Sequence, residues 1–140
     1  MKINYVENKN GKLFSFHRHD YKDNIDDEDN YIMIDGGFDD YIRCSGELKP
    51  GEIKDLMPEI REQFKWGNNF DENNNRLYKT IFKKLEELDI RHINNIIEYL
   101  LEKGSSKDEE NNFVYRKQIM AYILIFIYEL QNRLNNGKTI

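Results

Sequence analysis

The chain has 140 residues, of which 34% are charged and 39% hydrophobic, and its net charge at pH 7 is −5. This length predicts one domain over residues 1–140, and the single cysteine, Cys44, excludes an internal disulfide. The longest apolar run, residues 119–130, is too short to span a bilayer, and no secretion signal begins the chain. We therefore expect a cytoplasmic protein that makes no membrane contact.

Charge is distributed unevenly along the chain. Residues 1–48 hold 6 Lys or Arg and 11 Asp or Glu, whereas residues 49–140 hold 15 of each. A protein that tracks a long nucleic acid neutralises many phosphates with basic side chains. The balance therefore argues against long DNA or RNA as a partner, while a small phosphate ligand held by a few arginines remains compatible.

Residues 1–48 are predicted to form an antiparallel sheet. Residues 2–7 and 12–18 have strand character and are joined by a turn that contains Asn10-Gly11. Residues 30–35 and 38–44 flank Gly36-Gly37, which suits the positive φ angles of a two-residue hairpin turn. The acidic run 22–30 is predicted to be an exposed loop, and it lacks the glycine that an EF-hand calcium loop requires.

Residues 49–75 are predicted to be a connector that contains one short helix. Pro58 suits the first helical position, Gly67 suits the stop, and residues 68–75 form a polar loop. Residues 76–136 then form a predicted helical hairpin. Its first part has apolar residues at helical spacing, at Leu77, Ile81, Phe82, Leu85 and Leu88.

Asp89 is predicted to cap a second helical segment, which ends at Gly104 and carries an apolar stripe. The stripe consists of Ile93, Ile96, Ile97, Leu100 and Leu101. The last helix spans residues 112–136 and is apolar on every side between Ile119 and Leu130. Such a helix needs cover on all faces, which favours a homo-oligomer over a monomer covered by its own sheet. The predicted class is α+β, with an N-terminal antiparallel β-sheet followed by long C-terminal α-helices.

No catalytic motif is present. The sequence has no G-x-S-x-G elbow, Walker loop or dinucleotide G-x-G-x-x-G, and Cys44 is expected to be buried and inert. His17 and His19 fall on opposite faces of a strand, so they cannot share one metal ion. The carboxylates are scattered. We therefore predict a binding protein without enzymatic activity, metal or cofactor.

Residue types suited to a small nucleotide are available. Arginines hold phosphates, aromatic rings stack on bases, and Asn or His side chains contact base edges and hydroxyls. The candidates are Arg18, His19, Tyr41, Arg43, Phe82, His92, Asn95 and Arg116. For Phe82 the alternative is a plain core residue. For Tyr41 and Arg43 it is a solvated sheet face.

Four segments carry a family resemblance. RHDY (18–21) with YIMIDGGFDDYIR (31–43), followed by KWGNNFDENNNRLYKTIFKKL (65–85) and HINNII (92–97), resembles a small domain common in bacteriophage proteins, over residues 14–101. Many relatives have Cys-x-Cys-Gly between the first two segments. This chain has NIDDEDN at 24–30, so no metal is carried over. In size and layout the chain is similar to the phage anti-Thoeris sponge proteins.

That resemblance implies an N-terminal antiparallel sheet, long C-terminal helices, and ligand pockets between the subunits of a homodimer or larger homo-oligomer. Members of the family sequester cyclic ADP-ribose isomers (glycocyclic ADP-ribose) made by TIR-domain enzymes, without cleaving them, in the host bacterial cytoplasm during infection. Some also hold cyclic di- or trinucleotides at a second site.

By that resemblance Phe82 would stack on adenine, Arg18, Arg43 and Arg116 would hold the diphosphate, and His92 and Asn95 would contact hydroxyls or base edges. Two alternatives stay open. The chain could be a phage inhibitor or accessory protein that binds a protein partner through its apolar C-terminal helix. It could also be a small nucleotide hydrolase.

Overall fold

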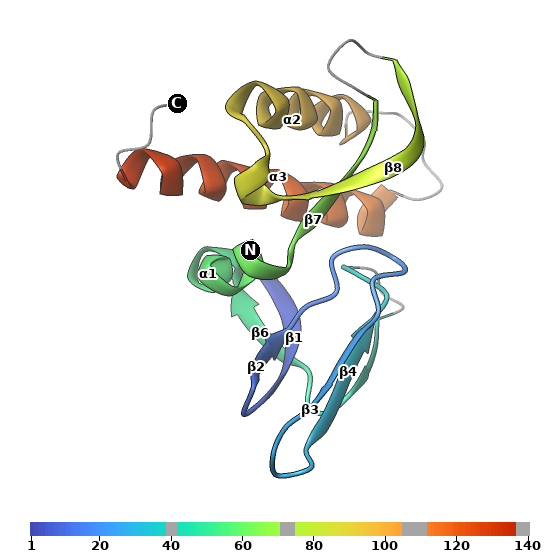
Figure 1. The fold of residues 1–140 in the computed structure, drawn as a ribbon, viewed down its shortest axis with the longest axis vertical. Helices are drawn as coiled ribbons and strands as arrows, with labels where there is room; N and C mark the ends of the chain where they lie inside the picture. The colour runs from blue at the N-terminus through green and yellow to red at the C-terminus, as the bar shows by residue number, and fades with distance from the viewer. Residues whose placement is uncertain (39–41, 71–74, 105–111, 137–140) are drawn as a thin grey trace.

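A computed structural model describes residues 1–38, 42–70, 75–104 and 112–136 (Figure 1). The fold is α+β, with small antiparallel sheets on one side and helices on the other. In chain order the elements are β1 (Lys2–Asn8), β2 (Gly11–Leu13), β3 (Lys22–Ile25), β4 (Tyr31–Asp35), β5 (Arg43–Ser45), β6 (Lys49–Glu52), α1 (Ile53–Gln63), β7 (Lys65–Phe70), β8 (Arg76–Lys84), the 3₁₀ turn η1 (Leu85–Glu87), α2 (Ile90–Gly104) and α3 (Asn112–Asn135). None of the described helices is long and apolar enough to cross a membrane.

The sheet layer consists of two three-stranded sheets, in the orders β2-β1-β6 and β3-β4-β5. The predicted Asn-Gly turn is confirmed, because β1 and β2 pair from Asn8 opposite Gly11. Along β4 the side chains alternate, so that Ile32 and Ile34 are buried while Tyr31 is exposed. With Val6 of β1 these two isoleucines form a small core between the sheets.

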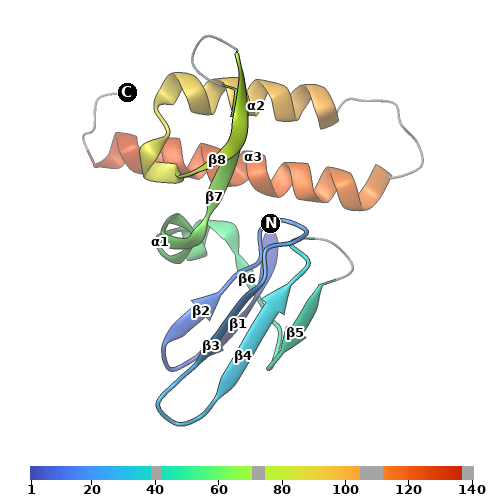
Figure 2. The same ribbon diagram turned by 45° about the vertical axis from the view of Figure 1, so that its right-hand side comes forward.

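The helical layer is an antiparallel pair, α2 and α3, which lie side by side above α1 (Figures 1 and 2). Asp89 caps α2 as predicted, because its Oδ1 accepts a hydrogen bond of 2.8 Å from the backbone N–H of His92. Ile93, Ile96 and Leu100 of the predicted stripe are buried, whereas Leu101 is exposed. Together with α1 and the segment after β2, the pair encloses the main core.

The stretch 119–130 of α3 is not apolar throughout as predicted, because it contains the buried carboxylate of Glu129, which ties α3 to its neighbours. Glu129 has no exposed surface and accepts hydrogen bonds of 2.5 and 3.2 Å from Nε of Arg61 on α1. Arg133, one turn further along α3, lies 3.7 Å from the same carboxylate and donates to the backbone oxygens of Leu85 and Leu88 at 2.8 and 2.5 Å. A buried charge is tolerated only when it is paired in this way.

The prediction of a helix from residue 76 to residue 88 is wrong. Arg76–Lys84 forms strand β8, which pairs with β7 in a two-stranded antiparallel ribbon. Ile81 and Phe82 are exposed, so their helical spacing reflects no buried face. Tyr, Thr, Ile and Phe favour strands, and here that preference and the pairing with β7 outweigh the coincidental period. The polar loop predicted for 68–75 is likewise wrong at its start, because β7 extends to Phe70.

The short helix was predicted too late in the chain. It is α1, which begins at Ile53 and contains Pro58 in its interior. Its buried stripe of Ile53, Leu56, Met57 and Ile60 outweighs the one helical hydrogen bond that proline removes. The connector also contains β6, which pairs with β1.

Three further boundaries need correction in the sheets. The second strand ends at Leu13, not at residue 18, and the acidic run 22–30 is not all loop, because Lys22–Ile25 pairs with β4 as β3. Gly36 and Gly37 have positive φ as predicted, but Asp35 pairs with Arg43, so the two strands are not joined by a two-residue turn. Cys44 is exposed rather than buried.

Candidate functional site

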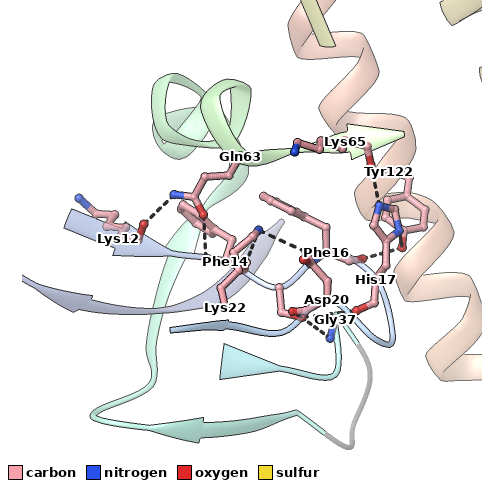
Figure 3. A network of polar contacts seen from close by, with 11 residues as sticks. Lys12, Phe14, Phe16, His17, Asp20, Lys22, Gly37, Gln63, Lys65 and Tyr122 are labelled. Atoms are coloured by element: carbon pink, nitrogen blue, oxygen red, sulfur yellow. Dashed lines mark hydrogen bonds and ion pairs between the residues drawn. The ribbon is translucent and has the colours of Figure 1, made fainter. Parts of the chain in front are cut away.

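The segment after β2 passes beneath α3 and inserts His17 into an aromatic cluster (Figure 3). The His17 ring lies 5.4 Å from that of Tyr122 and 5.7 Å from that of Phe64, between centroids. Its Nε2 donates to the backbone oxygen of Lys65 at 2.8 Å, and its Nδ1 lies 3.0 Å from the Tyr122 hydroxyl. Both ring nitrogens therefore have partners, and His17 joins the sheet layer to β7 and α3.

Tyr122 completes this network. Its hydroxyl donates to the backbone oxygen of Phe16 at 2.6 Å and accepts a hydrogen bond from Nε2 of Gln118 at 3.0 Å. Burial raises the pKa of Tyr122, because a phenolate would lose its hydration there. The arrangement holds the loop in place and leaves no open polar group for a ligand, so we assign it a structural role.

The Arg18-His19-Asp20 segment is fixed against the Gly36-Gly37 turn, as Figure 3 shows for Asp20 and Gly37. Ser15 Oγ accepts a hydrogen bond of 2.8 Å from Gly37 N–H and donates to the Asp20 backbone oxygen at 2.7 Å. A Cβ at Gly37 would lie 2.7 Å from the backbone carbon of His17, so only glycine fits here. The structure thus brings together the two sequence segments that carry Arg18, His19 and Arg43.

Lys22 holds the same loop in place through hydrogen bonds to Phe14 and Asp20. Its Nζ donates to the backbone oxygen of Phe14 at 2.7 Å and to Asp20 at 3.2 Å, and lies 4.6 Å from the centre of the Phe16 ring. Burial lowers the pKa of Lys22, and the positive charge of Lys65 lowers it further, while Asp20 acts in the opposite direction.

At this end of the sheet Arg18 and His19 are exposed, whereas Arg43 is already paired. Its guanidinium is 2.6 Å from Asp35, and this hydrogen bond holds the pKa of the Asp35 carboxyl below its ordinary value. The Arg43 side chain is 74% exposed, so it can still reach a ligand, but Asp35 competes for it. Tyr41 lies outside the described residues.

Phe82 occupies a different part of the molecule, the β7–β8 ribbon. Gly67 is directly opposite Phe82, and a Cβ at Gly67 would lie 3.1 Å from Cε1 of the Phe82 ring and 2.9 Å from Cγ2 of Thr80. The ring therefore lies against the glycine backbone on one side. It is 61% exposed, which excludes the interpretation of Phe82 as a core residue.

Two pairs flank Phe82 and Gly67 on the same ribbon face. On one side Thr80 donates a hydrogen bond of 2.6 Å to the Asn69 side chain. On the other side Lys65 lies directly opposite Lys84. Because side chains two apart on a strand share a face, the phenyl ring sits between an amide–hydroxyl pair and a pair of lysines.

The remaining candidates do not join either group through any contact that the structure describes. His92 is half-buried and Asn95 is exposed in the first turns of α2, and the side chain of Arg116 lies outside the described part. Phe82 likewise has no described contact with Arg18, His19 or Arg43. The predicted site residues thus form one group at the sheet end and one on the ribbon, with His92 and Asn95 on α2.

Sequence reasoning missed Lys65 and Lys84 as site residues, because both fell in segments that were assigned to helices or their ends. The signal that could have found them is the run YKTIF in β8, whose residues favour strands and whose last residue, Phe82, lies opposite Gly67. Within the described residues, no three His, Cys, Asp or Glu side chains lie close enough together to hold a metal ion.

The chain matches no protein-family model, no curated protein and no solved structure.

Proposed function

We propose that the chain binds and sequesters a cyclic ADP-ribose-type signalling nucleotide (glycocyclic ADP-ribose) without degrading it, as a phage protein that blocks TIR-dependent Thoeris immunity in the host bacterial cytoplasm. The observation that carries this proposal is the Phe82 ring, which is supported by Gly67 and open to solvent on the ribbon. Stacking on such a ring contributes on the order of 1–3 kcal/mol per base. A protein that only retains its ligand needs such contacts and no nucleophile.

The sheet-end group supplies further cations in this proposal. Arg18 and His19 are exposed beside the Asp35–Arg43 pair, and charge-assisted hydrogen bonds from such groups hold a diphosphate. This group has no described contact with Phe82, and we propose that Arg18 and Arg43 reach a ligand stacked on that ring from another subunit. The roles of His92, Asn95 and Arg116 at hydroxyls, base edges and phosphate are proposed on the resemblance alone.

An apolar stripe on α3 that the chain covers only in part supports self-association; within it, Ile123 and Leu130 also pack against the main core. Met120, Ile123, Ile127, Leu130 and Leu134 follow one another at spacings of 3, 4, 3 and 4 residues, which is the seam of a two-helix contact. Met120 is 57% and Leu134 61% exposed, and the three residues between them are half-buried. The charged side chains described on α3 near the stripe, Glu129 and Arg133, point into the core.

We propose that this α3 stripe meets the same stripe of a second subunit. The substitution Ile127→Glu should convert the oligomer to a monomer in sedimentation velocity, because it buries an unpaired charge at the centre of the contact. Lys117→Glu, on the same helix but outside the stripe, serves as the control. The same stripe is also the observation that favours the second candidate function, an inhibitor that binds a protein partner. A monomeric wild-type chain would favour that second function.

The proposed function is tested by ligand recovery. Purified protein is mixed with cyclic ADP-ribose isomers, freed of unbound ligand and denatured, and the released material is chromatographed. We expect an intact cyclic ADP-ribose isomer. Phe82→Ala should weaken retention at least tenfold, a change of about 1.4 kcal/mol, while Tyr99→Ala, at an exposed aromatic of α2, should not.

Two results contradict the proposal. Recovery of opened or cleaved nucleotide would make the chain a hydrolase. Recovery of no nucleotide would leave the α3 stripe and a protein partner as the remaining candidate.

A further inference from the structure

The register of the ribbon places two lysines opposite each other, while the charge of Lys65 also acts on Lys22 and Lys84 takes part in the cap of η1. Lys65 and Lys84 are directly opposite in an antiparallel pair, where like charges are destabilising. Among the ion pairs of the described residues, none joins either lysine to a carboxylate. The nearby Glu87 accepts a hydrogen bond from the backbone N–H of Lys84 and caps η1. An anion bound between the two ammonium groups would remove the repulsion.

The local charge of the ribbon also opposes that of the whole chain. Residues 65–84 hold five Lys or Arg and two Asp or Glu, a balance of +3, whereas the whole chain carries a net charge of −5. The ribbon therefore presents a basic surface on an acidic protein, and a basic surface attracts an anionic partner.

The position of the pair relative to Phe82 indicates the class of anion. Lys65 and Lys84 are two residues along the strands from Gly67 and Phe82, a separation of about 7 Å. This separation is comparable to the reach from a nucleobase across its ribose to a 5′ phosphate. The same face thus offers an aromatic surface for a base and two cations at the place where the phosphate of that nucleotide would lie.

We propose that the open face of the β7–β8 ribbon binds a 5′-phosphorylated nucleotide within a single subunit, with the base stacked on Phe82 and the phosphate held between Lys65 and Lys84. This inference rests on the proposed function for the role of Phe82. It assigns the phosphate to two lysines of the ribbon in place of Arg18, Arg43 and Arg116. The site is then complete in one chain and also accepts linear nucleotides.

The chain contains its own reporter of binding. Its single tryptophan, Trp66, lies in β7 between Lys65 and Gly67. Titrations of ADP, adenosine, pyrophosphate and the cyclic ADP-ribose isomers are followed by Trp66 fluorescence and by calorimetry. We expect ADP to bind at least tenfold more tightly than adenosine, and more weakly as salt is added, because the added affinity is electrostatic.

Variants separate the two contacts. Lys65→Gln and Lys84→Gln should each lower ADP affinity severalfold, and together bring it to the level of adenosine with little salt dependence. Phe82→Ala should weaken the binding of ADP and the binding of adenosine by the same factor. The matched control is Lys83→Gln, because Lys83 is next to Lys84 but opposite Trp66 and therefore on the other face of the ribbon. The ³¹P resonance of bound ADP should shift in the lysine variants and not in the control.

The outcomes distinguish this inference from the proposed function. If cyclic ADP-ribose is retained and depends on Phe82, but the lysine variants bind it and ADP as the wild type does, the lysine assignment is overturned and the proposed function stands. If ADP binds through Lys65 and Lys84 while no cyclic ADP-ribose isomer is retained, the inference stands and the proposed ligand is wrong. If an acidic peptide binds and no nucleotide does, both are wrong.

Discussion

The two faces of the β7–β8 ribbon use similar residue types in opposite ways. On the inner face Trp66 packs against Tyr122 and Phe126, with ring centroids 5.7 and 5.4 Å apart, and Asn68 is buried. On the outer face Phe82 lies against Gly67 and is largely open to solvent. The inner aromatic residues are explained by the core they form, whereas Phe82 belongs to neither of the described core clusters.

The polar and charged groups show the same contrast. Next to the inner face, His17 and Tyr122 have hydrogen-bond partners for each of their side-chain polar atoms. On the outer face two lysines oppose each other without an acidic partner among the described ion pairs. A residue whose interactions are satisfied within the chain is adequately explained by stability. A residue whose interactions are left open is where a ligand is expected.

The sharpest test of this contrast is the same substitution in the core next to the ribbon and on the outer face of the ribbon. Phe64 is fully buried and contacts the rings of Phe16, Trp66 and Phe126, so Phe64→Ala should lower the free energy of unfolding by about 3–5 kcal/mol. Phe82→Ala should lower it by less than about 1 kcal/mol, because the ring is largely exposed. Urea denaturation measures both values.

For nucleotide affinity the two variants should rank in the reverse order, with the larger loss in Phe82→Ala. Phe82→Ala should lose nucleotide affinity while remaining folded, and Phe64→Ala, measured under conditions where it is folded, should retain it. Comparable loss of stability in the two variants would contradict the assignment of the outer face to a ligand.

A smaller effect is expected when the Tyr122 hydroxyl is removed. Tyr122→Phe leaves the Phe16 backbone oxygen and one His17 nitrogen without this partner, at a cost of about 1–3 kcal/mol near neutral pH. Because burial raises the pKa of Tyr122 above its unfolded value of about 10, its contribution is complete below pH 10 and is lost as the pH rises further.

The pH dependence gives this prediction its control. The difference in unfolding free energy between wild type and Tyr122→Phe should shrink above about pH 10 in denaturation curves recorded from pH 7 to pH 11. The pKa of Tyr21 is raised by its hydrogen bond with Tyr31. Its ionisation changes the unfolding free energy of the wild type and of Tyr122→Phe by the same amount, so it cancels in the difference. A difference that is constant with pH would show that the hydroxyl is not buried as described.

Much of the framework was predictable because the deciding signals are local. The alternation in β4, the Asn-Gly turn, the positive φ of Gly36 and Gly37, the Asp89 cap and the long α3 each depend on residues close together in sequence. Strand β8 was not predictable in this way, because Leu77, Ile81 and Phe82 suit a helix as well as a strand. Only the pairing with β7 decides between them.

Some features of the candidate site also follow from local sequence, whereas others depend on tertiary structure. Arg18 and Arg43 were predicted to share a diphosphate, and the structure shows that the Arg18-His19 segment lies against the Gly36-Gly37 turn, where Gly37 closely approaches the backbone of His17. The lysine pair could not be anticipated, because residues 65 and 84 come together only through the register of the ribbon. The separation of Phe82 from Arg18 and Arg43 also depends on tertiary structure and has no local signal in the sequence.

The smallest expected change in stability is a gain, whereas the other substitutions lower stability. Lys65→Glu replaces a like-charge pair across the ribbon with an opposite-charge pair and also removes the positive charge that acts on Lys22, so it should raise stability by about 0.5–1 kcal/mol, or roughly 2–4 °C in Tm. It should also abolish ADP binding, because the introduced carboxylate would neutralise Lys84 and repel the phosphate. Differential scanning fluorimetry and the Trp66 titration measure the two effects on the same sample.

Lys83→Glu is the control for that variant, because the residue opposite is Trp66 and no charge pair forms. It should neither raise Tm nor abolish binding. A loss of binding accompanied by a gain in stability cannot be ascribed to misfolding, so Lys65→Glu separates a binding role for Lys65 from a structural one. If Lys65→Glu lowers Tm, the two lysines do not repel each other across the ribbon, and the case for an anion between them loses its physical basis.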